Sequence, residues 1–291
     1  MAAATGRVSP ARRDSTTSAP APRTDRPSTA GCCRTTPGQN VMSTRATNGV
    51  LCGLPGSTQE TPPSPLHAPC TGTSMASPHV SGGYAVFVEW FRKNLGGTPS
   101  PALVKAAFVN GAIDLSRRDG VDADGEPLTT IPNNQQGWGR FSLGRTIKSW
   151  RKGAVRLDQS VVFTDSGQSR SLRIEPIRAR RPLKATLVWT DAPGHGKGGE
   201  LPAWVNDLNL IVRGGGTNYR GNAFEDGWSV GGGKADRMNN VENVYLRRGG
   251  DKRYRVTVKA ANIIGDALPN HKGATDQDFA LVVTNARLVR P

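Results

Sequence analysis

The residues with the clearest chemical potential lie in one short run, Thr71-Gly72-Thr73-Ser74-Met75-Ala76-Ser77-Pro78-His79-Val80-Ser81-Gly82. Gly72 permits a close approach of the backbone, and Thr73 or Ser74 can cap the start of a helix. A serine there lies among backbone N–H groups without helical partners, at the positive end of the helix dipole. Such a serine is placed to act as a nucleophile whose oxyanion is held by its own N–H. A plain helix cap is the alternative interpretation.

Two helices are expected to position this serine. The apolar run from Tyr84 to Phe91 predicts a helix that is buried on most sides, and Gly96-Gly97 predicts where it ends. Ser100-Pro101 supplies a cap and a proline at the first helical position, which predicts a second helix through Ala112. One face of that helix is predicted to carry Leu103, Ala106, Ala107 and Asn110.

The full string GTSMASPHVSGG, residues 72–83, is far more specific than a G-x-S pattern. It resembles the active-site serine motif of the subtilisin-like serine peptidases, or subtilases. The resemblance implies that Ser74 is the acyl-enzyme nucleophile, that its backbone N–H helps to hold the oxyanion, and that His79 is structural. Residues 100–112 are similar to the helix that follows this motif in subtilases, and residues 134–141 to the turn that closes their catalytic domain.

The other groups needed for acyl transfer are missing from their expected places. A serine nucleophile needs a base, usually histidine, that is oriented by a carboxylate. In subtilases these lie far upstream in the order Asp, His, Ser. Here the residues before Ser74 contain the acids Asp14, Asp25 and Glu60 and the histidine His67, none in the family's sequence context. We therefore expect a fragment that lacks the catalytic Asp, His and oxyanion Asn, and that is inactive alone.

The composition changes near residue 70. Residues 1–70 contain no Phe, Trp, Tyr or Lys, and a stretch rich in Pro, Ser, Thr and Arg cannot bury enough apolar surface to offset its ordering entropy. We predict that residues 1–36 are disordered. The family resemblance resumes at Pro37–Arg45, which is similar to the strand and turn before the serine motif.

The origin of residues 1–36 has two interpretations. Codons for Ala30–Arg34, shifted by one base, can encode Pro-Asp-Val-Val-Ala, which is similar to the subtilase sequence before that turn. One hypothesis is thus that residues 1–36 are translated out of frame from a longer subtilase gene. The other is an ordinary disordered linker.

The four cysteines, Cys32, Cys33, Cys52 and Cys70, have no C-x-x-C spacing and no histidine at ligand spacing, which argues against zinc. Two interpretations stay open: a disulfide between Cys52 and Cys70, and free thiols without a role. The acids Asp122, Asp124 and Glu126 lie in VDADGE, but the rest of an EF-hand pattern is missing, so a solvated acidic turn is the simpler interpretation.

From about residue 151 the hydrophobic pattern changes to a period of two, as at Leu183–Trp189, Tyr254–Lys259 and Phe279–Val283. About seven short strands with Gly-rich turns predict a sandwich or jelly roll. The expected organisation has three parts. Residues 1–36 are the N-terminal segment, residues 37–150 the C-terminal part of a three-layer α/β catalytic domain, and residues 151–291 an all-β domain. We expect the catalytic part to be poorly stable, with exposed apolar helix faces, and the β domain to be the better folded.

The β segment also has a resemblance of its own. Leu187–Asp191, Val205–Leu210, Tyr219–Phe224 and Asn239–Val244 are similar to the C-terminal β-barrel domain of certain bacterial alkaline subtilases. In those relatives calcium is bound, and a hard cation needs oxygen ligands. The candidates are Asp191, Asp207 and Asn209 first, followed by Asn240, Glu242 and Asn243. Capping of turns by the same side chains is the alternative.

Two classes of function follow. One is a serine endopeptidase or its inactive remnant, acting on a polypeptide substrate; the other is a non-catalytic β module that binds or stabilises. The net charge of +15 allows a nucleic-acid partner, but the arginines are dispersed on strand faces, so we expect none. No apolar run approaches a membrane span, and we expect a monomer without membrane contact. The resemblance implies secretion, although the first residues do not form a signal peptide.

Overall fold

The computed structural model describes residues 42–45, 67–70, 73–118, 120–121, 126–194, 204–250 and 253–289, with side chains from Ala76 onward. The helices are α1 (Thr73–Leu95), α2 (Pro101–Gly111), the 3-10 turn η2 (Ser116–Arg118) and α3 (Leu143–Arg151). The strands are β1 (Met42–Arg45), β2 (His67–Cys70), β3 (Ala154–Phe163), β4 (Ser169–Pro176), β5 (Leu183–Val188), β6 (Asp207–Gly214), β7 (Thr217–Glu225), β8 (Trp228–Gly231), β9 (Val241–Leu246), β10 (Tyr254–Asn262), β11 (Gln277–Thr284) and β12 (Ala286–Leu288).

Ten of these strands form two antiparallel sheets that pack face to face. One has four strands in the order β3-β11-β5-β9, and the other has six in the order β12-β4-β10-β6-β7-β8. The core between them is built from alternate residues of both sheets, such as Leu187, Leu210 and Leu281, all at most 1% exposed. This is the sandwich that the period-two pattern predicts, although β7, β8 and β12 were not foreseen as strands. The strands β1 and β2 pair separately, with Met42 opposite Cys70.

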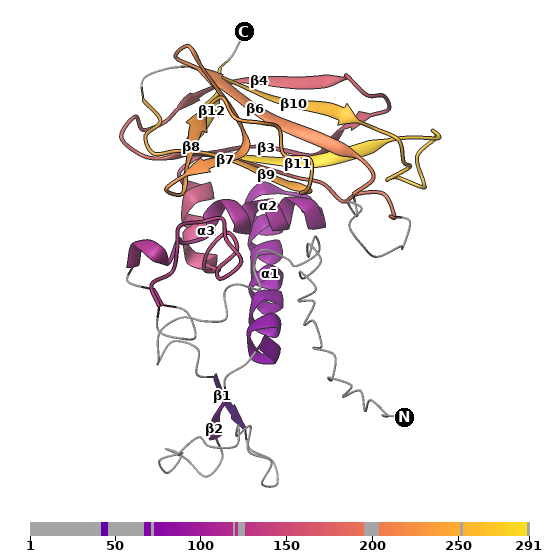
Figure 1. Ribbon diagram of the computed structural model, residues 1–291. Helices are drawn as coiled ribbons and strands as arrows, with labels where there is room; N and C mark the ends of the chain where they lie inside the picture. Colours follow the sequence, from indigo (N-terminus) through magenta and orange to yellow (C-terminus); the bar gives the residue numbers. More distant parts are fainter. Residues whose placement is uncertain are drawn as a thin grey trace, which may run out of the picture.

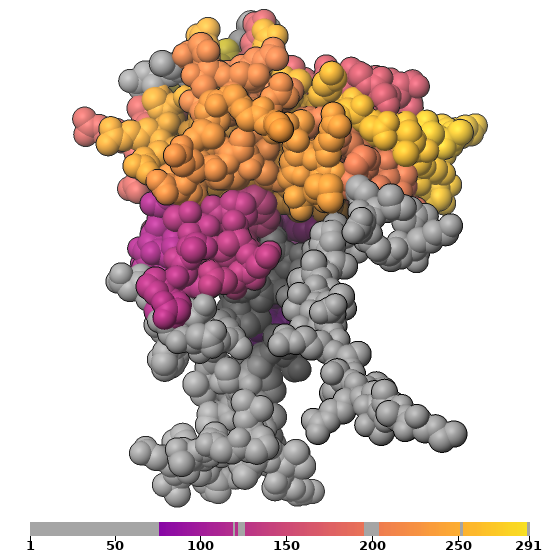
Figure 2. Space-filling view, in the orientation of Figure 1, coloured from indigo at the N-terminus to yellow at the C-terminus, as the bar shows by residue number. Residues whose placement is uncertain are grey.

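The helices cover the outer face of the four-stranded sheet. Figure 1 shows α2 lying along this sheet, with α1 projecting away from it. A second hydrophobic cluster joins them, in which Phe108 and Val109 of α2 pack with Val188, Ala280 and Val282 of the sheet. Helices and strands form one continuous surface in Figure 2. The described chain is therefore a layer of helices on a two-sheet sandwich whose strands pair antiparallel. The three-layer α/β arrangement of residues 37–150 stays a prediction.

The helix boundaries follow the local sequence. Ser100 caps α2 by accepting a hydrogen bond from the N–H of Leu103 at 3.0 Å, with Pro101 at the first helical position. Gly96 and Gly97 follow the end of α1 with positive φ angles of 75° and 72°, a conformation that glycine adopts without steric cost. Both boundaries match the predicted ones.

The burial of α1 differs from the prediction. Phe87 and Phe91 are buried against Trp150 of α3, but Val86 is 48% exposed. The reason is that, in the described part of the chain, α2 and α3 are the helices packed against α1, and they cover one side of it. The exposed apolar face expected of the helical part is thus confined to α1, because α2 is buried along nearly its whole length.

A buried polar network joins α2 to the sheet. The side-chain amide of Asn110 donates to the carbonyl of Lys184 and to Oγ1 of Thr186, both at 3.0 Å. Its Oδ1 accepts from Oγ1 of Thr284 at 2.7 Å. The hydroxyl of Tyr245 donates to the carbonyl of Val109 at 3.0 Å. These bonds satisfy polar groups that would otherwise be costly to bury between two apolar clusters.

Replacing Asn110 tests whether this network holds the layers together. The change Asn110→Ala should lower the free energy of unfolding by about 2–4 kcal/mol, because Thr186 and Thr284 then lose a partner in a buried site. Urea unfolding followed by circular dichroism measures the effect. Asn94→Ala is the matched control, since Asn94 is exposed and bonds the carbonyl of Trp90 in its own helix; a change within about 0.5 kcal/mol is expected there. Equal effects of the two changes would contradict the role of Asn110.

Candidate active-site segment

Ser74 lies in the first turn of α1, which begins at Thr73. The first N–H groups of a helix lack intrahelical partners, so the backbone here offers donors to an oxyanion. Pro78 follows four residues later inside the helix and has no N–H to donate to the carbonyl of Ser74. The helix start agrees with the prediction, while the side chain of Ser74 lies outside the described residues.

The described residues do not place a base beside Ser74. His67 is in β2, where its backbone pairs with Arg45, and His79 lies on α1 with an exposed side chain. The candidates Asp14, Asp25 and Glu60 lie outside the described residues. A His–carboxylate pair does occur elsewhere, with Nδ1 of His271 3.0 Å from Oδ2 of Asp276, but it belongs to the loop between β10 and β11. That carboxylate also accepts the N–H of Leu268, so the pair stabilises a loop.

The last glycine of the serine motif, Gly83, has a packing role. A Cβ atom on Gly83 would lie 2.4 Å from the ring of Phe141, whereas one on Gly82 would meet nothing within 4 Å. Phe141 in turn stacks on Phe108 of α2, with ring centroids 4.4 Å apart. The missing side chain at Gly83 therefore lets α1 approach the turn that follows α2.

That turn depends on the buried amide of Gln136, a residue without a predicted role. Gln136 is fully buried; its Oε1 accepts from the N–H of Leu115 at 2.9 Å and its Nε2 donates to the carbonyl of Thr129 at 2.8 Å. Gly139, with φ of 107°, brings the backbone against Ile113, which pairs with Arg140. The sequence does hint at this role, because Gln136 directly precedes the turn glycines Gly137 and Gly139 in the run 134–141.

Residues 12–139 match the subtilase family. This subtilase segment, as we call residues 12–139, contains Ser74, α1, α2 and the turn at Gly139. The match begins before Pro37, where the recognisable motifs start, and its N-terminal part lies outside the described residues. The hypothesis that residues 1–36 are out of frame, and the domain boundaries at 36 and 150, stay predictions.

The chain has no match among curated proteins. A CBM35 from Cellvibrio japonicus Abf62 shares 13% identity at a TM-score of 0.24, covering 47% of this chain and 99% of that one. A protein from Sulfurospirillum deleyianum shares 7% at 0.20, covering 44% and 96%. The GH115 4-O-methyl-α-glucuronidase BtGH115A shares 8% at 0.23, covering 73% and 25%. At such TM-scores none of these carries an argument about this chain.

The calcium candidates are not assembled into a ligand set within the described part of the chain. There, no group of three His, Cys, Asp or Glu side chains could hold a metal ion. Asp191 accepts the backbone N–H groups of Ala192, Val205 and Asn206, which is the turn-capping alternative. Asn209 lies in β6 opposite Lys259. Asp122 and Asp124 lie outside the described residues, and Glu126 is exposed. Calcium binding stays a prediction that this geometry does not support.

Instead, two of the candidate acids, Asp207 and Glu242, are buried in ways that disfavour their charged forms. Asp207 is 6% exposed, and burial, followed by Asp236 and Asp191, raises its pKa to about 6 against the opposing effect of Arg237. Glu242 is fully buried, and burial raises its pKa well above the usual value. Its Oε2 accepts the N–H of Leu210 at 2.6 Å, while Oε1 has no hydrogen-bond partner.

The position of Glu242 has a structural cause. Strands β6 and β7 pair from Ile211 to Gly214, so the N–H of Leu210 lies just beyond the ladder. Gly221 of β7 leaves room there, because a Cβ atom would lie 2.0 Å from Oε2 of Glu242. The carboxyl group thus takes the place of a strand partner where the sheet opens.

Glu242→Gln should stabilise the protein above neutral pH. The folded-state pKa of Glu242 is raised, so its stability contribution is full below the unfolded pKa and is lost as pH rises through the folded pKa. Glutamine keeps an acceptor for Leu210 without the charge, so a gain of about 1–3 kcal/mol in unfolding free energy is expected at pH 8, shrinking towards pH 4. Urea titrations across this pH range measure it.

The control for this series is Glu89→Gln. Glu89 is exposed and pairs with Lys93, which lowers its pKa, so its small pH dependence should have the opposite sign. Two results together would contradict a destabilising buried charge at Glu242. The Glu242→Gln protein would be less stable than the parent at pH 8, and EDTA would lower the stability of the parent to the same level. That result would show a bound cation instead.

Proposed function

We propose that this chain is the C-terminal part of a subtilisin-like serine endopeptidase in which Ser74 is the nucleophile. The observation that carries the proposal is the string at residues 72–83 within a segment that matches the subtilase family, with Ser74 in the first turn of a helix. By this proposal Ser74 attacks a peptide carbonyl, and its backbone N–H helps to hold the resulting oxyanion. The substrate is a polypeptide, and the family resemblance favours secretion.

The chain alone is proposed to be inactive. Peptide hydrolysis through serine requires a base to take the hydroxyl proton and later return it to the leaving amine. His79 lies on the same helix as Ser74, five residues on, with an exposed side chain, and α1 adds no acid in its first turn. The Asp and His would have to come from a polypeptide that supplies the N-terminal half of the catalytic domain.

The alternative is a non-catalytic β module that retains a vestigial peptidase segment. One observation favours it: α2 seals the outer face of the four-stranded sheet, with Val188, Val241, Ala280 and Val282 in the joint cluster. The peptidase segment would then be retained because it stabilises the fold, and not because it catalyses a reaction. Membrane association is not proposed, and no helix in the described part is long and apolar enough to span a bilayer.

Active-site labelling separates the two proposals. A fluorophosphonate probe should not label the chain alone, because without a base the hydroxyl of Ser74 stays a weak nucleophile. Labelling should appear when an N-terminal half of a bacterial subtilase catalytic domain, bearing Asp and His, is refolded with the chain. Ser74→Ala should abolish it and Ser77→Ala, three residues along the same helix, should not.

Two outcomes bear on the alternatives. Labelling of the chain alone would contradict the missing base and reveal one within the chain. Absence of labelling from a refolded complex that forms by size-exclusion chromatography would contradict the peptidase proposal and favour the β module.

A further inference from the structure

A basic cavity of about 580 Å³ opens where the helical layer meets the sandwich. Its walls come from the end of α2, from η2, from the start of α3 and from strands β5 and β8. The charged residues that line it are Asp114, Arg117, Arg118, Arg145 and Lys184. Four cations thus face one carboxylate, and Trp228 adds an aromatic wall.

Lys184 is the deepest of these cations. It is 8% exposed, and its Nζ makes a single long hydrogen bond, 3.4 Å to the carbonyl of Asn110 at the end of α2. The ammonium also lies 4.0 Å from the ring centroid of Tyr245. No ion pair joins it to a carboxylate among the described residues. An ammonium group has three donors, and burying it without an anionic partner is costly.

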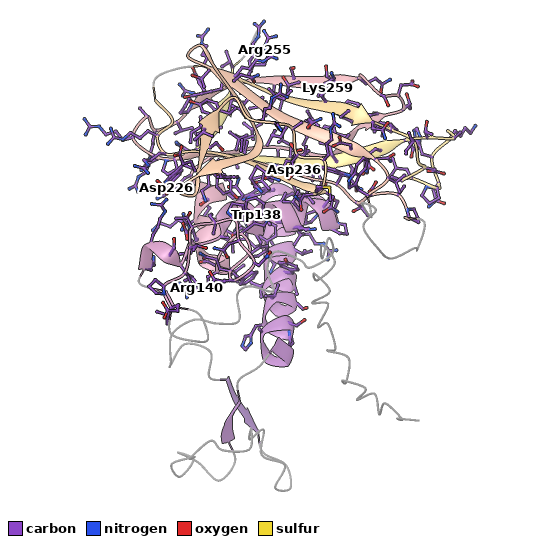
Figure 3. All side chains as sticks on the ribbon, in the orientation of Figure 1. Trp138, Arg140, Asp226, Asp236, Arg255 and Lys259 are labelled. Carbon is purple, nitrogen blue, oxygen red and sulfur yellow. The ribbon has the colours of Figure 1, made fainter. Side chains whose placement is uncertain are left out.

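The single carboxylate does not neutralise the cavity. Asp114 forms an ion pair with Arg117, with Oδ2 3.1 Å from Nε, and its Oδ1 accepts from Ser116 and Gln136. Arg117 also donates to the carbonyl of Asp226, which lies near the junction of the two layers in Figure 3. Asp114 and Arg117 therefore satisfy each other, and Arg118, Arg145 and Lys184 are left without a counter-charge in the described part of the chain.

The remaining cations destabilise one another's charged forms. Burial lowers the pKa of Arg145, and Arg118 lowers it further. Burial, followed by Arg145, lowers the pKa of Lys184 to about 7, with Asp114 opposing and Arg117 adding to the shift. Tyr245, whose own pKa is raised by burial, faces Lys184 as a neutral ring.

Trp228 supplies a further donor. Its Nε1 is buried without a hydrogen-bond partner, and the guanidinium of Arg117 lies 5.4 Å from the ring centroid. A buried indole N–H normally has a hydrogen-bond acceptor. The N–H of Trp228 has none. An anion with several oxygens would supply acceptors to all of these donors at once.

We propose that the basic cavity binds a small oxyanion, a phosphate or sulfate group, held by Lys184, Arg145 and Arg118 with Trp228 as a neutral donor. Guanidinium groups match the geometry of such oxygens, and a lysine adds a point charge. The volume accommodates the ion with water or with the small molecule that carries it. This site is independent of the peptidase proposal, because it does not involve Ser74.

Sulfate is the probe that tests the proposal, because its charge does not change between pH 6 and pH 8. Isothermal titration of the whole chain at constant ionic strength, with chloride as the balancing anion, should show saturable binding at one site. Affinity should fall as pH rises through the pKa of Lys184, because the neutral amine loses its charge.

The variants assign the site. Arg145→Gln and Lys184→Met should each weaken sulfate binding at least about tenfold, and Lys184→Met should remove the pH dependence. Arg255→Gln is the matched control, since Arg255 is exposed on β10 of the other sheet (Figure 3) and should leave binding unchanged. Circular dichroism checks the fold of each variant. Arg145 is only partly buried and its side chain reaches the surface, so Arg145→Gln keeps the test valid if Lys184→Met unfolds.

The outcomes are distinct. Binding that is absent, or equally weakened by Arg255→Gln, would overturn the proposal, as would unchanged affinity in a folded Arg145→Gln protein. A second titration with a sugar phosphate distinguishes the source of the group. Inorganic phosphate is titrated beside it. A sugar phosphate that binds more tightly than inorganic phosphate indicates that the natural ligand is an organic ester, and equal affinities indicate the free ion. Each result supports an oxyanion site.

Discussion

The structure depends on the docking of α2 onto the four-stranded sheet. Asn110 lies near the C-terminal end of α2, and its side-chain NH2 and Oδ1 pair with groups from β5 and β11. Apolar packing between layers is non-directional, so it favours contact without fixing a register. A buried amide that requires specific partners adds that register, because a shifted helix would leave the Asn110 side chain and the Thr284 hydroxyl without their partners. The turn after α2, and the glycine contact that brings in α1, follow from this placement.

The same docking creates the unusual electrostatics of the junction. A sandwich face would normally meet water, yet β5, β9 and β11 are buried along their whole lengths. Lys184 is on the covered face and has lost its solvent, while the end of α2 provides a carbonyl in place of a carboxylate. Arginines from η2 and α3 gather at the rim. The basic cavity is thus a consequence of laying a helix over a strand that carries a lysine.

The groups that the proposed peptidase reaction needs must come from several elements, whereas a helix and the sheet it covers are enough for the packing. Ser74 and the backbone donors around it need only a helix N-terminus, which a short local sequence can specify. The base and its carboxylate must reach the same point from other elements, and the described residues do not bring them there. Helix α2 by contrast is buried along nearly its whole length against β5 and β11. One segment can therefore be a well-packed structural layer and, under the proposed function, an incomplete catalytic site.

The sequence by itself determined the local features: the start of α1 at the serine motif, the cap at Ser100, the end at Gly96 and most strands of the sandwich. Such features depend on neighbours in the chain, on periodicity and on capping chemistry. Only the tertiary structure decided that the polar side of β5 is covered, that Glu242 replaces a strand partner and that Asp191 accepts backbone N–H groups of the turn after β5. Alternation along a strand tells which side chains share a face, but what lies against that face comes from residues distant in sequence. The burial of Lys184 by α2 is the clearest case.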